Sequence, residues 1–339
     1  MTKISIPGKL FLAGEYAITH PGNTALIVAI TTGLQIEITS ATNSSTITSD
    51  TISDDLKFNI GQSFSELNHE WRFVCAAIKI FTQYLDMKKL NDNLHEIHIS
   101  IESDMNHSTG KLGLGSSAAV VVGIISALNK HFEIDLPILK QFKLAALAHL
   151  HIQKNGSLGD VAAITYGGVI AYNSPDLSTY ILSDKNWIQP ELVEITWQNL
   201  KITPLLWPAS WNILLGATHE SADTHKALLS GSLTTDFFHQ SDEITKNIIH
   251  SVINSDYNNF SNNLKSNQIL LSNTLPKKYV TPKLSKLLQS LGTTAGKISG
   301  AGFGDNGFAV VNAPTKLPEQ WQAAGIDARY IKIAPQNRG

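Results

Sequence analysis

Apolar positions at helical spacing occur in several separate stretches of the chain. Between Trp71 and Leu85, apolar side chains recur at intervals of three and four residues, which predicts an amphipathic helix. Residues 118–128 are apolar on every side and predict a helix that is buried on most faces. Further helices are expected over residues 136–153, 235–254 and 256–271. Both halves of the chain therefore contain a substantial helical part.

Alternating apolar and polar positions predict strands in the first third of the chain. Leu34, Ile36 and Ile38 alternate with polar residues, and residues 95–103 follow the same pattern, so both stretches are expected to be half-buried strands. Residues 4–30 are apolar and β-rich but contain Pro-Gly steps. We expect short strands there, separated by turns at residues 7–8 and 20–23.

The remaining segments give a simpler pattern. Residues 39–51 are rich in Ser, Thr and Asn, which favours an exposed loop or hairpin tip. Strands are expected at residues 167–172, 211–216 and 308–311, and a glycine-dense loop at 296–307. The mixture of helices and strands predicts an α+β protein.

Length and composition exclude several classes of protein. A chain of 339 residues exceeds what one hydrophobic core serves, so two domains are expected. Lys and Arg number 26 against 28 Asp and Glu, which disfavours nucleic acid as the main partner. The single cysteine, Cys75, excludes an internal disulfide and a Cys-rich metal site. Because no long apolar run or signal-peptide pattern is present, we expect a cytoplasmic protein without a membrane partner.

A glycine-rich turn followed by two hydroxyls is the strongest chemical signal. Gly113-Leu114-Gly115-Ser116-Ser117 precedes the buried apolar helix. Glycines let the backbone approach an anion closely, and the first turn of a helix offers unpaired N–H groups at the positive end of its dipole. The alternative is a tight turn with a serine as helix N-cap, which is common in α/β proteins. On the glycines alone, the two interpretations are about equally favoured.

Two familiar phosphate motifs do not account for this loop. The Walker pattern fails because no lysine precedes the serines. The dinucleotide pattern G-x-G-x-x-G/A matches residues 113–118, with acids at Glu133 and Asp135. However, the segment before Asp135 is not a buried apolar strand, and no βαβ repeats follow. We interpret this match as coincidental.

Three separated segments together resemble the GHMP kinase superfamily, which includes galactokinase, homoserine kinase, mevalonate kinase and phosphomevalonate kinase. They occur in the family's order and at about its spacing, so the resemblance spans nearly the whole chain. They are Pro7-Gly8-Lys9-Leu10-Phe11-Leu12-Ala13-Gly14-Glu15-Tyr16-Ala17, Gly113-Leu114-Gly115-Ser116-Ser117-Ala118-Ala119 and Lys297-Ile298-Ser299-Gly300-Ala301-Gly302-Phe303-Gly304-Asp305-Asn306-Gly307.

The resemblance implies a two-domain α+β fold. An N-terminal ribosomal-protein-S5-like α/β domain, expected at residues 1–195, would bind the nucleotide. A C-terminal ferredoxin-like domain, expected at residues 196–339, would carry the third motif, with the active site in the cleft between the two. Within the superfamily the chain is most similar to the bacterial phosphomevalonate kinase branch, in residues 8–10, 13–17, 156–162, 167–172 and 304–306.

This branch implies an ATP- and Mg²⁺-dependent kinase of the mevalonate pathway. Its reaction converts phosphomevalonate to diphosphomevalonate in isoprenoid precursor synthesis, with a phosphate group as acceptor. Mevalonate kinase, another small-molecule kinase of the superfamily, or a catalytically silent metabolite-binding relative are the alternatives. The resemblance leaves open whether the chain forms a homodimer. Residues 220–224 carry Glu220 and Asp223 where the family has a more neutral stretch, and such carboxylates would repel a phosphorylated acceptor.

The second motif and a lysine before it are expected to hold ATP. The resemblance implies that backbone amides of the loop bind the phosphates and that Ser116 or Ser117 supplies a magnesium ligand; we assign Ser117. Lys111 is expected to reach phosphate oxygens, although an exposed turn lysine is an equal alternative. The expected ATP-binding residues are Lys111, Gly113, Leu114, Gly115, Ser116, Ser117 and Ala118.

Two charged residues are expected to carry the catalysis. A phosphate acceptor is mostly dianionic at neutral pH and needs no general base, so the essential device is a cation between two anions. We assign this role to Lys9 and expect Asp160 to orient it. With an alcohol acceptor, Asp160 would be the general base.

The acceptor side is expected to involve two further segments. Ser157 would bind the acceptor, with a turn-capping serine as the alternative. A second backbone cradle near the acceptor or the γ-phosphate would be formed by Gly300, Ala301, Gly302 and Gly304, with a glycine-rich hairpin as the alternative.

Overall fold

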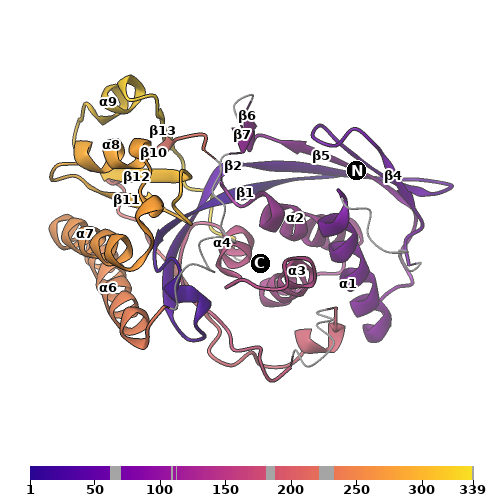
Figure 1. Ribbon diagram of the computed structural model, residues 1–339. Helices are drawn as coiled ribbons and strands as arrows, with labels where there is room; N and C mark the ends of the chain where they lie inside the picture. The colour runs from indigo at the N-terminus through magenta and orange to yellow at the C-terminus, as the bar shows by residue number, and fades with distance from the viewer. Residues whose placement is uncertain (62–69, 108–109, 112, 181–187, 221–232, 338–339) are drawn as a thin grey trace.

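Two β-sheets, one in each half of the chain, organise the molecule (Figure 1). The computed structural model describes residues 1–61, 70–107, 110–111, 113–180, 188–220 and 233–337. The first sheet has seven strands in the order β4-β3-β5-β2-β8-β9, with β1 paired to β2. Its strands are β1 (Thr2–Ala13), β2 (Thr24–Ser40), β3 (Ser45–Ser49), β4 (Leu56–Phe58), β5 (Ile97–Ser103), β8 (Val169–Asn173) and β9 (Lys201–Leu205).

Four helices lie on one face of the first sheet (Figure 1). They are α1 (Arg72–Lys88), α2 (Ser116–His131), α3 (Ile138–Gln153) and α4 (Gly159–Tyr166). Helices α2 and α4 contact the strands of this sheet, and α1 and α3 pack against the other helices. The helices predicted at residues 71–85, 118–128 and 136–153 are confirmed, as is the strand at 95–103. Helix α2 is apolar on most sides because it contacts α1, α3, α4 and the sheet. Short elements complete this half: η1 (Ala17–Thr19), β6 (Asn106–His107), β7 (Gly110–Lys111) and η2 (Pro190–Val193).

Two sequence predictions in the first sheet are wrong. The Pro7-Gly8 step is not a turn: β1 continues through it, with a shift of register against β2 between these residues. A β-bulge accommodates Pro at this position and lets the strand continue. Residues 39–51 are not simply an exposed loop, because β3 pairs in parallel with β5 and buries Ile47. The sequence pattern did not predict β3, because four of its five residues carry hydroxyl groups.

The second half is a four-stranded antiparallel sheet in the order β11-β12-β10-β13 with its own helices. The strands are β10 (Asn212–Ala217), β11 (Ala295–Ser299), β12 (Asn306–Val311) and β13 (Asp327–Ile331). The helices are α6 (Thr235–Ile253), α7 (Tyr257–Thr274), η3 (Lys277–Tyr279), α8 (Pro282–Ser290) and α9 (Leu317–Ala323). The expected loop at 296–307 is shorter than predicted, because its first residues form β11 and its last belong to β12.

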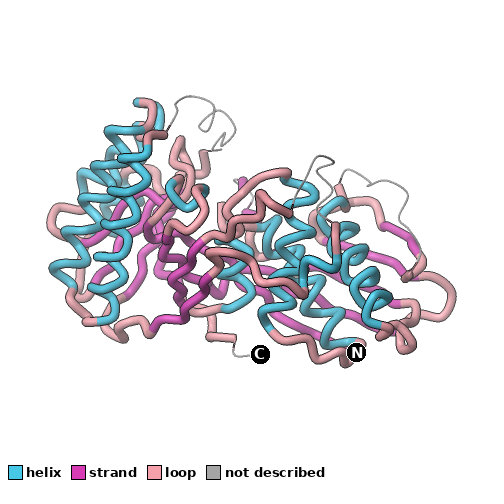
Figure 2. The backbone as a smooth tube through the Cα atoms, turned by 90° about the horizontal axis from the view of Figure 1, so that it is seen from below, coloured by secondary structure: helices cyan, strands magenta, loops and turns pink. Residues whose placement is uncertain are grey.

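The two halves are joined through β1 and β2. The backbone N–H of Thr24 donates to Asp242 on α6, and Ile30 forms an antiparallel bridge with Ile333. Figure 2 shows strands (magenta) between the helices (cyan) of the two halves of the molecule. The chain passes from one sheet to the other between β9 and β10, and the domain boundary at residue 195 stays a prediction. Among the described residues, no helix combines the length and apolarity that a membrane crossing requires.

Candidate active site

Lys9 lies on β1 just after the bulge, with its ammonium at the start of α4. Its backbone N–H donates to the carbonyl of Leu114, which ties β1 to the glycine-serine loop. The side chain is 10% exposed, and its Nζ lies 3.8 Å from Asp160 Oδ2 and 3.4 Å from the carbonyl oxygen of Gly113. The ammonium also lies 5.4 Å from the centre of the Phe11 ring. The predicted pair of Lys9 and Asp160 is therefore present, at a spacing that leaves Lys9 able to bind an anion.

Asp160 is held in the first turn of α4 by a tight turn. Leu158, the N-cap, has a φ of 65°, and Ser157 Oγ accepts a hydrogen bond from the N–H of Gly159 at 3.3 Å. The hydroxyl of the buried Tyr172 donates to the Ser157 carbonyl. The Ser157 hydroxyl thus has the turn-forming contact of the alternative interpretation, and its contact with an acceptor stays a prediction.

The glycine-serine loop bends beside Lys9 and opens α2. Gly113 and Gly115 have φ values of 65° and 84°, in the left-handed region that favours glycine. A Cβ atom at Gly115 would lie 2.8 Å from Lys9 Cε, so the lysine packs directly on this bend. Gly115 is the N-cap of α2, and the serines are the first two residues of the helix. The interpretation of this motif as a serine N-cap is therefore wrong.

Three further residues were predicted to bind ATP, namely Leu114, Ala118 and Lys111. Leu114 and Ala118 are buried in the core, where they fix the loop. Lys111 lies on β7, and its side chain is outside the described part of the chain, so its phosphate contact stays a prediction.

The two serines have different surroundings. Ser117 Oγ lies 3.2 Å from Nε2 of His149, a buried residue on α3. Burial lowers the pKa of His149, and the charge of Asp160 partly opposes this effect. A neutral imidazole can orient the Ser117 hydroxyl without adding charge beside the loop. Sequence reasoning missed His149 because it lies far from the glycine motif along the chain.

A second glycine bend joins β11 to β12 and reaches the first. Gly300, Gly302 and Gly304 have φ values of 72°, 72° and 107°. The Tyr16 hydroxyl donates to the carbonyl of Ala301 at 2.5 Å, so residues of the first motif hold this bend. A Cβ atom at Gly113 would lie 2.8 Å from Asp305 Oδ2, and one at Gly300 would lie 3.3 Å from the same atom. The structure therefore brings the two bends and Lys9 together, as the sequence predicted.

Asp305 lies between the bends and was not among the predicted site residues. Burial raises the pKa of its carboxyl group to about 6, while the nearby Lys9 lowers it. The Gly-Asp step in the third motif was the available signal, but a single acid among glycines does not indicate such a position.

A buried ion pair fixes the second bend at its base. Lys297 on β11 donates to Glu15 Oε1 at 2.5 Å, and both side chains are almost completely buried. Next to them, the Ser299 hydroxyl donates to the carbonyl of Phe11 at 2.7 Å. These contacts join the third motif to the first and so fix the second bend to the chain around β1, which the Lys9 N–H ties to the first bend.

Metal binding at this site would depend on a bound nucleotide. Among the described residues, no group of three or more His, Cys, Asp or Glu side chains could hold a metal ion. Mg²⁺ commonly binds through one or two protein oxygens together with substrate phosphates and water. The hydroxyls at the start of α2 fit such a partial ligand set.

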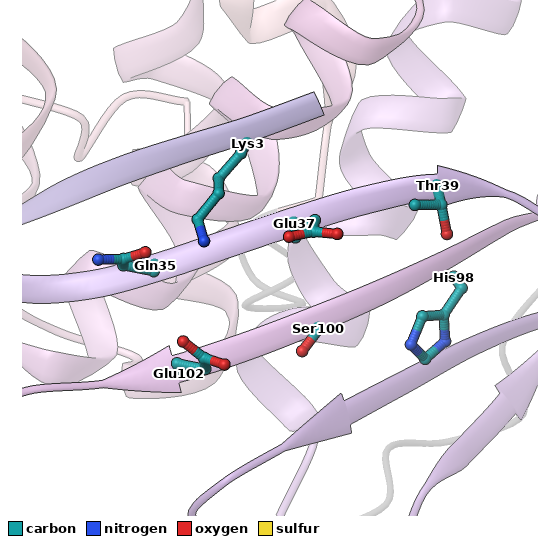
Figure 3. Close-up of a pocket in the computed structure, with 7 residues that line it drawn as sticks. All are labelled: Lys3, Gln35, Glu37, Thr39, His98, Ser100 and Glu102. Carbon is teal, nitrogen blue, oxygen red and sulfur yellow. The ribbon is translucent and has the colours of Figure 1, made fainter. Parts of the chain in front are cut away.

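A separate pocket of about 290 Å³ lies on the other face of the first sheet. Figure 3 shows the alternating polar side chains of β1, β2 and β5 that line it. They are Lys3, Gln35, Glu37, Thr39, His98, Ser100 and Glu102. None belongs to the three motifs, and antiparallel sheets commonly have one solvated polar face. This pocket is therefore separate from the site predicted at the glycine bends.

Models of one protein family match both halves of the chain. The model for the GHMP kinases N terminal domain matches residues 72–168, and the model for the GHMP kinases C terminal matches residues 248–327. The chain is 28% identical to the phosphomevalonate kinase of Streptomyces sp. (strain CL190), over 94% of both chains.

The chain is also similar to a solved structure of a phosphomevalonate kinase and, over a shorter part, to a mevalonate kinase. The Streptococcus pneumoniae phosphomevalonate kinase in complex with phosphomevalonate and AMPPNP has a TM-score of 0.88 and 26% identity, over 98% of this chain and 100% of that one. A mevalonate kinase of Saccharolobus solfataricus is 27% identical over only 51% of each chain.

Proposed function

The chain belongs to the GHMP kinase superfamily, and we propose that it transfers the γ-phosphoryl group of ATP to phosphomevalonate, forming diphosphomevalonate. The observation that carries the proposal is the convergence of the two glycine bends on the Lys9 ammonium. Similarity to phosphomevalonate kinases over almost the whole chain supports the choice of acceptor.

Charge neutralisation is the main task of this site. Phosphoryl transfer between two phosphate groups requires two anions to approach in line, and positioned cations lower the barrier. Lys9 lies where the two bends meet and is largely buried, so its charge is weakly screened. Asp160, at 3.8 Å, orients the ammonium without closing it off. A dianionic phosphate acceptor is already nucleophilic, and Asp160 therefore needs no role as a base.

The first bend is the proposed site for the ATP phosphates. Gly113 and Gly115 have left-handed backbone conformations at the N-terminus of α2, where the dipole favours negative charge. Ser117 is the proposed magnesium ligand, with His149 orienting its hydroxyl. Bound Mg²⁺ would neutralise charge on the β- and γ-phosphates. The second bend would hold the acceptor phosphate or the γ-phosphate through its amides.

Mevalonate kinase is the second candidate function. In that reaction the acceptor is an alcohol, and Asp160 would act as general base. The mevalonate kinase of S. solfataricus matches about half of this chain, whereas the phosphomevalonate kinase of Streptomyces matches 94%. A catalytically silent relative is disfavoured by the presence of both Lys9 and Asp160 in contact geometry. Location in the cytoplasm and assembly into a homodimer stay predictions.

An acceptor comparison tests the proposal. ADP release is measured by coupled assay with ATP, Mg²⁺ and either phosphomevalonate or mevalonate, and Lys9→Ala serves as a control for contaminating kinases. We expect turnover with phosphomevalonate that Lys9→Ala abolishes. Turnover of mevalonate alone would establish the second candidate, and nucleotide binding without transfer to either acceptor would indicate a silent relative.

A further inference from the structure

The carboxyl group of Asp305 occupies the junction of the two glycine bends. Its Oδ2 lies 2.8 Å from the position of a Cβ atom at Gly113 and 3.3 Å from that at Gly300. It therefore stands at the place where backbone amides of two motifs would bind phosphate oxygens. A negative charge there competes with the negative charge of a ligand.

Hydrogen bonds on both sides of Asp305 hold its backbone in place. The Thr218 hydroxyl donates to the carbonyls of Gly304 and Asp305, and the N–H of Asp305 donates to Gly302 at 3.2 Å. The next residue, Asn306, is the first of β12 and pairs with Ala217 of β10. These contacts therefore hold the backbone from which the Asp305 carboxyl group reaches the junction.

The charged groups around Asp305 come from several elements. The charge of Lys9, on β1, favours the ionised form of Asp305. The phenol of Tyr16, which follows β1 in the chain, is near enough for the charge of Asp305 to raise its pKa. Glu220, after β10, lies against Gly304 and is 3.9 Å from the Lys283 ammonium. Burial raises the pKa of Asp305 to about 6 in the free protein. A dianion bound beside it would raise that pKa further, because like charges disfavour ionisation.

We propose that Asp305 is an additional phosphate-binding residue. It balances the charge of Lys9 in the free protein and takes up one proton from solvent when a phosphate group binds. The resulting carboxylic acid then donates a hydrogen bond to a phosphate oxygen. This inference rests on the proposed function in that it places phosphate at the two bends. It makes anion binding depend on pH in a way that a site of amides and lysines alone would not.

Binding of sulfate tests the inference without turnover. Inorganic sulfate stays a dianion between pH 6.0 and 7.5, so the ligand itself does not titrate. Equilibrium dialysis with radiolabelled sulfate is done on wild type, Asp305→Asn and Glu319→Gln. Asn is neutral and has an N–H donor, so it imitates the protonated acid. Glu319, an exposed carboxylate in the first turn of α9, is the matched control for loss of a charge.

We expect wild type and Glu319→Gln to bind sulfate about tenfold more tightly at pH 6.0 than at 7.5. Asp305→Asn is expected to bind it tightly at both pH values. An equal pH dependence in wild type and Asp305→Asn would overturn the inference, as would absence of sulfate binding by wild type. Loss of binding in Asp305→Asn at both pH values would also overturn it. If Asp305→Asn does not fold, Asp305→Ser is compared by the same criterion.

The outcome is separable from that of the acceptor assay. A protein that binds sulfate with the expected pH dependence but does not phosphorylate phosphomevalonate would keep the anion site and lose the proposed function. A protein that phosphorylates phosphomevalonate but binds sulfate without this pH dependence would keep the function and lose the role of Asp305.

Discussion

The Lys297 ammonium donates to Glu15 Oε1 at 2.5 Å and joins the third motif to the first inside the molecule. The pair is almost completely buried, and Lys297 also donates to the carbonyl of Ile298. Burial lowers the pKa of Lys297, and the charge of Glu15 opposes that effect. The bend that carries Asp305 starts at Gly300, three residues after Lys297, so the ion pair lies at its base.

Breaking this pair should destabilise the protein strongly. Lys297→Met leaves the Glu15 carboxylate buried without its cation, and we expect a loss of about 3–5 kcal/mol in the free energy of unfolding. The double variant Lys297→Met with Glu15→Leu should lose less, because no uncompensated charge remains. Urea unfolding at pH 7 measures both. A single variant as stable as wild type would contradict this prediction.

Removal of the Lys9 ammonium should affect turnover more than folding. We expect Lys9→Met to lower kcat by about 10²–10³-fold, because the two anions then meet without their cation. Asp160→Asn should have a smaller effect with phosphomevalonate, since its proposed role is to orient Lys9. Steady-state kinetics and thermal unfolding are compared with those of Lys316→Met, an exposed lysine outside the site. Loss of stability with normal kcat of the folded fraction would argue against a catalytic role for Lys9.

The adjacent serines provide a matched pair for the magnesium site. Ser117 contacts His149, and Ser116 begins the same helix. Ser117→Ala should raise the Mg²⁺ concentration for half-maximal nucleotide binding about tenfold, since loss of a metal-ligating or supporting group has effects of this size. Ser116→Ala should leave it nearly unchanged. Titration of Mg²⁺ against a fluorescent ATP analogue measures both, and the reverse order would assign the metal to Ser116.

Much of the fold and part of the site could be predicted from the sequence. The helices α1, α2 and α3 have a regular apolar pattern, and the glycine motifs identify the bends and Lys9. Strand β3 was missed because its residues are mostly hydroxyl-bearing. The bulge at Pro7-Gly8 was mistaken for a turn, because local propensity does not include pairing with β2. His149, Glu15 and Asp305 act through contacts between distant segments, which spacing along the chain cannot indicate.

Acid should destabilise the protein through His149 and His151, because burial lowers the pKa of both side chains. Burial and the charges of Lys154 and Lys79 lower the pKa of His151 to about 4, and burial also lowers that of His149. The unfolded chain takes up protons near pH 6.5, so stability falls as the pH decreases from about 6.5 to 4. His151→Gln should reduce the fall in the free energy of unfolding over this pH range by about 1–2 kcal/mol. The effect is limited to this size because the His151 side chain is partly exposed to solvent. Urea unfolding at pH 7 and pH 4.5 measures it, and equal pH dependence in both proteins would contradict the prediction.

Asp305 should reduce stability at neutral pH, in the opposite sense to the histidines. Burial raises the pKa of Asp305 from 3.8 to about 6, so the folded protein binds its proton more readily than the unfolded chain does. Stability from this group is therefore greatest below about pH 4 and is lost as the pH rises through 6. We expect Asp305→Asn to be more stable than wild type by about 1–3 kcal/mol at pH 7.5 and by little at pH 4.

Urea unfolding of Asp305→Asn at these two pH values measures the difference, with Glu319→Gln as control. An ionised acid retained at a site of this kind costs stability, and proteins commonly keep such groups where function requires them. A variant less stable than wild type at pH 7.5 would mean that attraction to Lys9 exceeds the cost of burial. The carboxylate would then be a structural partner of that lysine, and the ligand-free site would favour the ionised acid.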